Sequence, residues 1–267
     1  MQTPLRWAGS KKALLPILRQ HWSAKSKRYV EPFCGSARLF FDIEPQSAIL
    51  ADINSELIST YRAIKENPEK VISILEKLPV TKKAYYEVRK IDPNNLSDSQ
   101  VAARFLFLNK LCFNGIYRTN KQGKFNVPCG RQKRKVRFDF DSIRAASSLL
   151  KKAKLESSDF QSILSDTKKG DFVYLDPPYA IAKRRVFSEY HPESFSEDDI
   201  LRLQRCLKDM DSRGVHFVVS YGDSKEGRKL VAAWPHRRVQ TRRHIAGFVD
   251  SRRIAYELMA SNVELAA

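Results

Sequence analysis

The sequence lacks the features that mark membrane and secreted proteins. No apolar run approaches the roughly 18 residues that a membrane-spanning helix needs, and the first residues, MQTPLRWAGSKK, lack the apolar core of a signal peptide. Only four cysteines are present, and they are far apart with no C-x-x-C pair (Cys34, Cys112, Cys129 and Cys206). This spacing favours reduced thiols over disulfides or a zinc site. We therefore expect a soluble protein of the cytoplasm.

Metal-ligand spacings, internal repeats and low-complexity segments are missing as well. The five histidines share no spacing typical of metal ligands, so no metal centre is expected. Hydrophobic residues make up 42% of the 267-residue chain, which is enough for a sizeable core and excludes wholesale disorder. The length suits one large domain, or one domain with a smaller insert.

Acidic side chains are scarce, because 30 Asp and Glu stand against 48 Lys and Arg and leave a net charge of +18. The stretch Arg118–Arg137 holds eight basic residues and no acid, and Arg237–Arg253 holds six arginines and only Asp250. A solvated basic surface usually mixes in acids for i,i+4 pairing. Aromatic neighbours such as Phe125 also suit stacking on bases. The pattern favours contact with nucleic-acid phosphates over a protein that is merely basic.

Short apolar strands alternate with helical segments along much of the chain. The pattern predicts strands at 28–33, 48–53, 154–156, 171–176 and 215–220, and helices at 11–22, 36–43, 55–77, 81–91, 99–112, 141–151 and 196–213. A hairpin or ordered loop is expected at 113–137, and a β-hairpin at 237–262 with its turn near Gly247–Asp250. The strand–helix–strand unit implies a parallel sheet. We predict an α/β domain from residues 1–55 and 141–267, interrupted by a helical insert at 56–140.

Two features near the N-terminus indicate a nucleoside-bearing cofactor. The segment YVEPFCGSA (29–37) joins a strand to a helix through a turn at Gly35, and such a turn lets backbone amides approach a ligand closely. One glycine departs from G-x-G-x-x-G, so an ordinary βα turn is the alternative. The following strand ends at Asp52, where an acid can accept both hydroxyls of a ribose. These residues do not identify the cofactor.

The strand DFVYL is followed by Asp176-Pro177-Pro178-Tyr179. The prolines stiffen the backbone and remove two N–H donors, which leaves carbonyls free to point into a site. An Asp at the carboxyl end of a strand lies where ligands bind in open α/β sheets. The group suits an exocyclic amino group on an aromatic ring, since Asp176 and the Pro177 carbonyl can accept its two N–H bonds while Tyr179 stacks on the base. If the prolines merely ended the strand, Asp176 and Tyr179 would have no role.

Together with other segments, these motifs resemble the Dam-like DNA adenine-N6 methyltransferases nearly from end to end. The matching segments are RWAGSKKALLP (6–16), VEPFCGSARLFF (30–41), LADINSELISTYRAIKENP (50–68), NKLCFNGIYRTNKQGKFNVPCGR (109–131), GDFVYLDPPY (170–179) and RRIAYELMASN (252–262). The resemblance implies a Rossmann-like methyltransferase fold with a helical target-recognition insert and a β-hairpin. It also implies S-adenosylmethionine (SAM) as methyl donor, duplex DNA as partner, GATC as target and a monomer in solution.

The resemblance assigns roles to individual residues. Catalysis falls to Asp176, Pro177 and Tyr179. Contacts with the cofactor fall to Trp7, Lys11, Glu31, Phe33, Gly35, Asp52, Asp159, Phe160 and Asp176. Contacts with DNA fall to Arg6, Asn114, Arg118, Asn120, Lys124, Pro128, Arg131 and Lys133. Arg6 and Gln132 replace a Lys and a Tyr of a relative, which bears on the target sequence rather than on the reaction. By themselves, Trp7 also suits a core aromatic and Lys11 a solvated charge.

Two other functions stay open on the sequence. One is methylation of cytosine N4 or of an adenine in RNA; the Asp before PPY favours adenine, and residues 109–131 resemble readers of duplex DNA. The other is a nucleic-acid-binding module without catalysis, against which the intact Asp52, Asp176 and Tyr179 argue. We expect a nucleoid-associated, site-specific DNA adenine methyltransferase. An orphan regulator, a phage enzyme and the partner of a restriction nuclease are equally compatible with the sequence.

Overall fold

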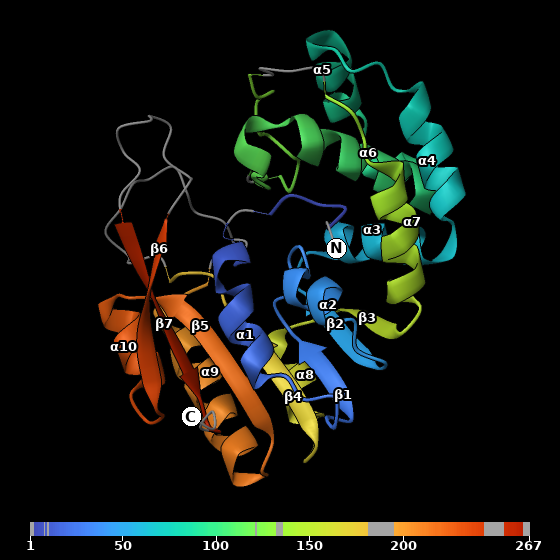
Figure 1. Cartoon of the computed structure of the whole chain (residues 1–267). Coiled ribbons are helices and arrows are strands. Elements are labelled where there is room, and N and C mark those ends of the chain that lie inside the picture. Colours follow the sequence, from blue (N-terminus) through green and yellow to red (C-terminus); the bar gives the residue numbers. More distant parts are fainter. Residues whose placement is uncertain are drawn as a thin grey trace.

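The computed structural model describes residues 3–7, 9, 11–120, 122–131, 136–180, 195–242 and 254–263. A seven-stranded sheet of order β3-β2-β1-β4-β5-β7-β6 forms its centre (Figure 1). Five strands pair in parallel, namely β1 (Arg28–Glu31), β2 (Ala48–Asp52), β3 (Ala153–Ser157), β4 (Asp171–Leu175) and β5 (His216–Gly222). Strand β7 (Ile254–Ser261) lies antiparallel between β5 and β6 (His236–Arg242). The predicted Rossmann-like α/β fold is confirmed.

Helices cover both faces of the sheet because the central strands are apolar on both sides. In β4, Phe172 and Tyr174 pack on one face, and Val173 and Leu175 pack on the other. The first face is covered by α1 (Leu15–His21), α2 (Arg38–Ile43) and α3 (Ser55–Glu66). The second is covered by α8 (Phe160–Ser165), α9 (Glu197–Ser212) and α10 (Lys225–Val231).

The strand order reverses between β1 and β4. From β1 the chain moves outward to β2 and β3, whereas β4 and β5 extend the sheet in the other direction. In open α/β sheets, ligands bind at the carboxyl ends of the strands beside such a reversal. Here the residues after Glu31 and those after Leu175 meet at that point.

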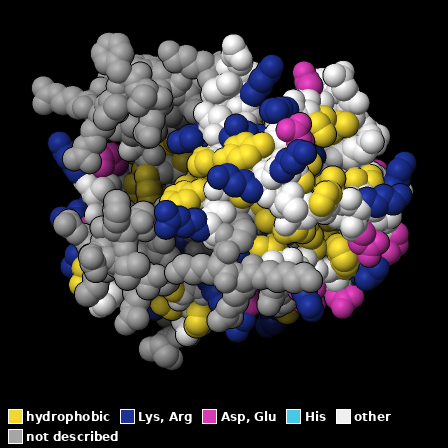
Figure 2. Space-filling view, turned by 90° about the horizontal axis from the view of Figure 1, so that it is seen from above, with side chains coloured by type: hydrophobic (Ala, Val, Ile, Leu, Met, Phe, Trp, Pro, Cys, Tyr) yellow, Lys and Arg dark blue, Asp and Glu magenta, His cyan; other side chains and the backbone are white. Residues whose placement is uncertain are grey.

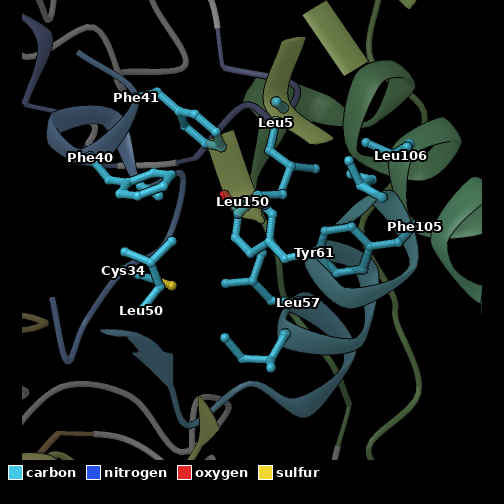
Figure 3. Packing of buried hydrophobic residues seen from close by; sticks show 14 of the residues in the cluster. Leu5, Cys34, Phe40, Phe41, Leu50, Leu57, Tyr61, Phe105, Leu106 and Leu150 are labelled. Carbon is cyan, nitrogen blue, oxygen red and sulfur yellow. The ribbon is translucent and has the colours of Figure 1, made fainter. Parts of the chain in front are cut away.

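A helical lobe lies beside the β2–β3 side of the sheet in Figure 1. It contains α4 (Pro68–Lys77), α5 (Lys82–Lys90) and α6 (Asp98–Leu111), with α3 and α7 (Phe140–Leu150) next to the sheet. Its apolar side chains join those of the sheet domain in one core, as Figure 3 shows for Phe41, Leu57, Tyr61 and Phe105. The core therefore crosses the boundary expected at residue 56, and the division into two domains stays a prediction.

Some elements differ from the sequence prediction. The helix expected at 55–77 is divided at Asn67, because Pro68 cannot continue α3 and instead begins α4. Helices α8 and α10 were not predicted. The antiparallel pair of β6 and β7 confirms the C-terminal hairpin, whose turn at Gly247–Asp250 lies outside the described residues. In the described part of the chain, no helix combines the length and apolar character needed to cross a membrane.

Candidate active site

A cavity of about 640 Å³ opens at the carboxyl ends of β1, β2 and β4. Its volume is in the range of small-molecule sites. The fold brings all nine residues predicted for the cofactor to its wall, together with the whole of the DPPY motif. These nine are Trp7, Lys11, Glu31, Phe33, Gly35, Asp52, Asp159, Phe160 and Asp176.

Asp176 is fixed from two sides. Lys11 Nζ lies 3.0 Å from Asp176 Oδ1, and Ser220 Oγ donates to the same oxygen at 3.3 Å. The Tyr174 hydroxyl lies 3.0 Å from Ser220 Oγ and completes a buried chain. Burial raises the pKa of Asp176, and Lys11 acts in the opposite direction. For Lys11, burial opposes the charge, but the neighbouring Asp176, Tyr179 and Glu257 outweigh it and raise its pKa above the usual value. The two side chains therefore form an ion pair.

Tyr179 is held by a residue that the sequence reasoning missed. Its hydroxyl donates to Glu257 Oε1 at 2.7 Å, and Glu257, on β7, is only 4% exposed. Glu257 Oε2 lies 3.7 Å from Lys11 Nζ. The Tyr179 ring meets Tyr221 edge-on with centroids 5.3 Å apart, yet 40% of Tyr179 stays exposed. Burial, mainly, raises the pKa of Tyr179 to about 12, so the hydroxyl remains a donor. A fixed but exposed ring can serve as a stacking surface.

Gly35 and Asp52 connect two turns at the cavity wall. Gly35 has a φ of +45°, and a Cβ at this position would lie 2.7 Å from the Trp7 ring, so the indole takes the space that the glycine leaves. Asp52 Oδ2 accepts the Gly35 N–H at 3.0 Å, and Oδ1 accepts the Asn54 N–H at 3.0 Å. Gly35 thus leaves room for the Trp7 ring and donates its N–H to Asp52. Without a side chain, it also lets the backbone lie directly at the cavity wall.

Two aromatic rings form another part of the cavity wall. The rings of Phe33 and Phe160 are 5.3 Å apart between centroids. Arg202 of α9 donates to Asp159 at 2.7 Å, and its guanidinium lies 4.8 Å from the Phe160 centroid. Arg202 was not predicted, and it contacts both Asp159 and Phe160, which the resemblance assigned to the cofactor. Glu31 lies deeper, where it accepts the Tyr29 hydroxyl at 2.8 Å and burial raises its pKa well above the usual value.

A cation completes the lining. Arg38 lines the cavity, and its Nε is buried without a hydrogen-bond partner among the described residues. A buried guanidinium nitrogen without an acceptor suits a ligand carboxylate. The carboxylate of Asp52, the rings of Phe33 and Phe160 in the cavity wall, and Arg38 match the ribose, purine and amino-acid carboxylate that SAM carries. The residues present therefore fit this group.

The predicted recognition loop is a hairpin over its described residues. Antiparallel bridges join Cys112 to Cys129 and Thr119 to Phe125. Arg118 is exposed, and its Nε donates to Asn126 Oδ1 at 2.8 Å. Asn120 closes the tip, because its side-chain oxygen accepts the N–H groups of Gln122 and Lys124. Other residues predicted to contact DNA are exposed on or beside the loop, namely Arg6, Asn114, Lys124, Pro128 and Arg131. Lys133 and Gln132 lie outside the described residues.

The helical lobe anchors this hairpin. The Tyr85 hydroxyl donates to the Val127 carbonyl at 2.8 Å. The Tyr117 hydroxyl donates to Glu56 at 2.9 Å, and Glu56 also pairs with buried Arg104 at 2.8 Å. Figure 2 looks down on this end of the molecule and shows Lys and Arg side chains gathered around apolar ones. The anchoring leaves basic side chains exposed on a rigid base.

The N-terminal segment is attached to the same lobe. The side-chain amide of Asn109, on α6, accepts the Arg6 N–H at 2.9 Å and donates to the Arg6 carbonyl at 2.7 Å. Trp7 stacks on Phe105 and Tyr117, with centroids 6.4 and 5.9 Å apart. Trp7 is therefore both part of the aromatic packing and part of the cavity wall.

In the basic C-terminal stretch, the exposed side chain of Arg238 has partners within the chain. It pairs with Asp223 at 2.7 Å, and its guanidinium lies 3.6 Å from the Tyr256 centroid. This arginine therefore has internal partners while more than half of its side chain stays exposed, and the phosphate contact expected for the stretch remains a prediction. Residues 243–253 of the stretch lie outside the described part. Among the described residues, no group of His, Cys, Asp and Glu side chains could hold a metal ion.

A Rossmann-like sheet with a DPPY motif at its strand reversal and a basic hairpin nearby defines an enzyme of the methyltransferase class that acts on nucleic acid. The chain belongs to the D12 class N6 adenine-specific DNA methyltransferases, a family that it matches over residues 7–245. It is thus an adenine-specific DNA methyltransferase.

Its relatives include type II methyltransferases and DNA adenine methylases. The chain is 34% identical to the type II methyltransferase M1.LlaDCHI of Lactococcus lactis, over 96% of this chain and 94% of that protein. It is 32% identical to the type II methyltransferase M.MjaIII of Methanocaldococcus jannaschii, over 97% of this chain and 98% of the relative. The chain is 33% identical to the retron Ec67 DNA adenine methylase of Escherichia coli, over 97% of this chain and 91% of that protein.

Proposed function

We propose that this enzyme transfers a methyl group from SAM to N6 of an adenine flipped out of duplex DNA, with GATC as the target sequence. The observation that carries the proposal is the position of Asp176. It lies in the cavity at the carboxyl end of β4, is held by Lys11 and Ser220, and has Tyr179 beside it.

The reaction demands an activated amine. The adenine N6 lone pair is delocalised into the ring, which makes the nitrogen a poor nucleophile. Hydrogen bonds from its two protons to Asp176 and to the Pro177 carbonyl favour a tetrahedral nitrogen and free the lone pair. SAM would supply the methyl group from its sulfonium: the carbon–sulfur bond would break as the N6–carbon bond forms, the sulfur would leave as a neutral thioether, and the methylated amine would lose one proton to solvent. The protein's contribution is positioning and electrostatics, which requires no covalent intermediate with the chain.

A base inside a duplex cannot present N6 to this cavity, so the adenine must leave the stack. Tyr179 replaces the lost stacking, and Glu257 holds the tyrosine hydroxyl so that the ring keeps its orientation. In the cofactor part of the cavity, Asp52 accepts the ribose hydroxyls, and Phe33 and Phe160 pack against the adenine ring. The wall is completed by Trp7, Lys11, Glu31, Gly35 and Asp159. We assign the ligand carboxylate to Arg38.

Residues 56–140 form the target-recognition part, and residues 1–55 and 141–267 form the catalytic part. The hairpin at 112–130, which continues directly from α6, supports this division. Arg118 reads a base, whereas Arg6, Lys124, Arg131 and Lys133 hold phosphates. Asn114, Asn120 and Pro128 shape the hairpin surface that faces DNA.

Two measurements test the proposed function. Transfer of a tritiated methyl group from SAM to duplex DNA tests the reaction, and long-read sequencing of DNA from expressing cells locates N6-methyladenine by motif. We expect methylated adenine in GATC. Label on cytosine or only on RNA would contradict the proposed substrate, and methylated adenine in another motif would contradict GATC alone.

We expect Asp52→Ala to weaken SAM binding by about 1–3 kcal/mol, because a charged acceptor of the ribose hydroxyls is lost. Calorimetric titration measures the affinity. Asp52 also accepts the Gly35 N–H, so a thermal melt must accompany the titration to detect loosening of the turn. Unchanged SAM affinity in a folded variant would remove Asp52 from the ribose site and leave the role of Asp176 intact.

Arg118→Ala is expected to cost about 1–3 kcal/mol at one base pair of the target, because an arginine can grip guanine O6 and N7 through two hydrogen bonds. Lys124→Ala, on the same hairpin, should weaken all sequences alike and reduce the salt slope by about one unit. The assay compares methylation of GATC with its single-base variants. Equal discrimination by wild type and Arg118→Ala would make Arg118 a phosphate anchor or a structural residue.

A further inference from the structure

Lysines precede three of the parallel strands. KSKR (25–28) leads into β1, KKAK (151–154) into β3 and KKGD (168–171) into β4. Parallel strands begin at one edge of a sheet, so these lysines gather at the edge opposite the active-site cavity. We call this surface the amino-end basic face. Its seven lysines are all exposed, namely Lys25, Lys27, Lys151, Lys152, Lys154, Lys168 and Lys169.

The face is concave. A hollow of about 640 Å³ is lined by Lys27, Lys168 and Lys169, and a second hollow of about 510 Å³ is lined by Lys151, Lys152 and Lys154. The two hollows share Arg28, Ser47 and Asp166, so they form one continuous surface.

Little of its positive charge is neutralised. Of the lining acids, Asp171 is buried and pairs with Arg28, and Glu156 pairs with Lys154. Asp166 is therefore the one lining acid without an ion pair among the described residues, and its single negative charge compares with five lysines that form none either. These lysines are Lys27, Lys151, Lys152, Lys168 and Lys169. A Cβ at Gly170 would meet Lys27 Cδ at 3.0 Å, and one at Gly214 would meet Lys169 Cδ at 3.7 Å. The stems of Lys27 and Lys169 thus lie close to glycine backbone.

The chemistry of the face selects a polyanion. None of the large hydrophobic side chains exposed in the described part of the chain lies on it, since they occur at Ile53, Val80, Ile91, Phe113, Tyr179, Leu201 and Val263. Protein interfaces are built around apolar and aromatic anchors, which this face lacks. Exposed lysines that outnumber the neighbouring acids and have no exposed apolar anchor beside them suit phosphate groups, which they contact as flexible point charges.

The distance between the two ends of the sheet makes the face independent of the active site. The five residues of β4 span about 16 Å at roughly 3.3 Å per residue, or about two Debye lengths at physiological salt. Charges at the amino ends therefore add little to the binding of DNA at the carboxyl ends. We propose that the amino-end basic face binds the phosphate backbone of a second duplex segment while the first segment occupies the active site. The first segment's role rests on the proposed function; the second contact does not.

The test measures one enzyme holding two duplexes. Two short duplexes with different fluorophores are mixed with the enzyme, and energy transfer between them reports a complex that contains both. Sedimentation at excess DNA must then give one protein with two duplexes. We expect the triple variant Lys27→Gln, Lys168→Gln, Lys169→Gln to lose at least about tenfold in affinity for the second duplex. Its salt slope for that step should fall by about two to three units, because each phosphate contact contributes about 0.9.

A matched triple variant separates this face from net charge. Lys208, Lys225 and Lys229 are exposed on α9 and α10, outside the proposed target-recognition part, so changing them to Gln removes the same charge elsewhere and should leave the second duplex bound. Both triples should methylate a single short duplex at the wild-type rate.

The proposal is overturned if wild type shows no energy transfer at low salt, if both triples lose it equally, or if the first triple loses single-duplex methylation. Binding to anionic lipid vesicles in place of the second duplex would also overturn it. An enzyme that binds two duplexes but methylates neither would refute the proposed function alone.

Discussion

Replacing Asp176 with alanine is expected to slow methyl transfer by at least about 100-fold, because the variant lacks the acceptor that orients the attacking amine. The side chain lies at the end of β4 in the cavity and is held at 3.0 Å by Lys11. Single-turnover transfer of a tritiated methyl group to a short duplex measures the chemical step without product release.

The matched control is Asp166→Ala, an exposed aspartate before β4 at the opposite edge of the sheet, which should leave the rate unchanged. A circular dichroism spectrum checks that Asp176→Ala folds. If that folded variant methylated DNA at nearly the wild-type rate, Asp176 would not be the acceptor and the assignment of the active site would be wrong.

The second large effect is expected at Lys11. Lys11→Met leaves two carboxylates, Asp176 and Glu257, without their shared cation in a largely buried position. Removing one partner of a buried pair costs about 3–5 kcal/mol, and we expect the lower end because Asp176 keeps a side-chain exposure of 22%. Urea unfolding measures the loss. Lys12→Met, an exposed neighbour, is the control and should be nearly neutral.

The same variant has a pH signature. Burial raises the pKa of Asp176 and Lys11 lowers it, so losing the cation raises that pKa further. The proposed acceptor is the ionised form of Asp176. In a plot of methylation rate against pH, the fall of the rate at low pH should therefore begin at a higher pH in the variant than in wild type. Without Lys11, the carboxylates of Asp176 and Glu257 repel each other. Adding Glu257→Gln to Lys11→Met removes one of these two negative charges and should recover part of the stability. Unchanged stability in Lys11→Met, or no recovery in the double variant, would contradict this account of the network.

The sheet and the catalytic motif were predictable because their signals are local. Parallel strands buried on both faces are continuous apolar runs, so 171–176 was recognisable, and the prolines after Asp176 marked the end of β4. Helices α8 and α10 have only six and seven residues, too few to show a helical period. They are defined instead by their N-caps, Asp159 and Ser224, whose side chains accept backbone N–H groups.

Glu257 could not be assigned from spacing, because it lies 78 residues from Tyr179 and reaches it through strand register. Glu257 pairs with Gly222 across β5 and β7, and that register places its side chain beside the active site. One sequence signal was present, a single acid in the apolar strand AYELMAS. From the sequence, the glycine at position 35 was expected to let backbone amides approach a ligand closely. Only the fold shows that the Trp7 ring occupies the space that a side chain at Gly35 would need.

The two hydrogen bonds between the Asn109 amide and the Arg6 backbone link events at two ligands. The N-terminal segment carries Trp7 and Lys11 to the wall of the cavity proposed for the cofactor, while α6 continues directly into the hairpin proposed to face DNA. We therefore expect that a ligand which orders the segment also orders the base of the hairpin. Thermodynamic linkage makes such coupling reciprocal, so the factor by which the methyl donor tightens DNA binding must equal the factor by which DNA tightens binding of the donor. Asn109→Ala should reduce by the same amount the factor by which the methyl donor tightens DNA binding and the factor by which DNA tightens donor binding. Titrations of each ligand with and without the other measure the two factors.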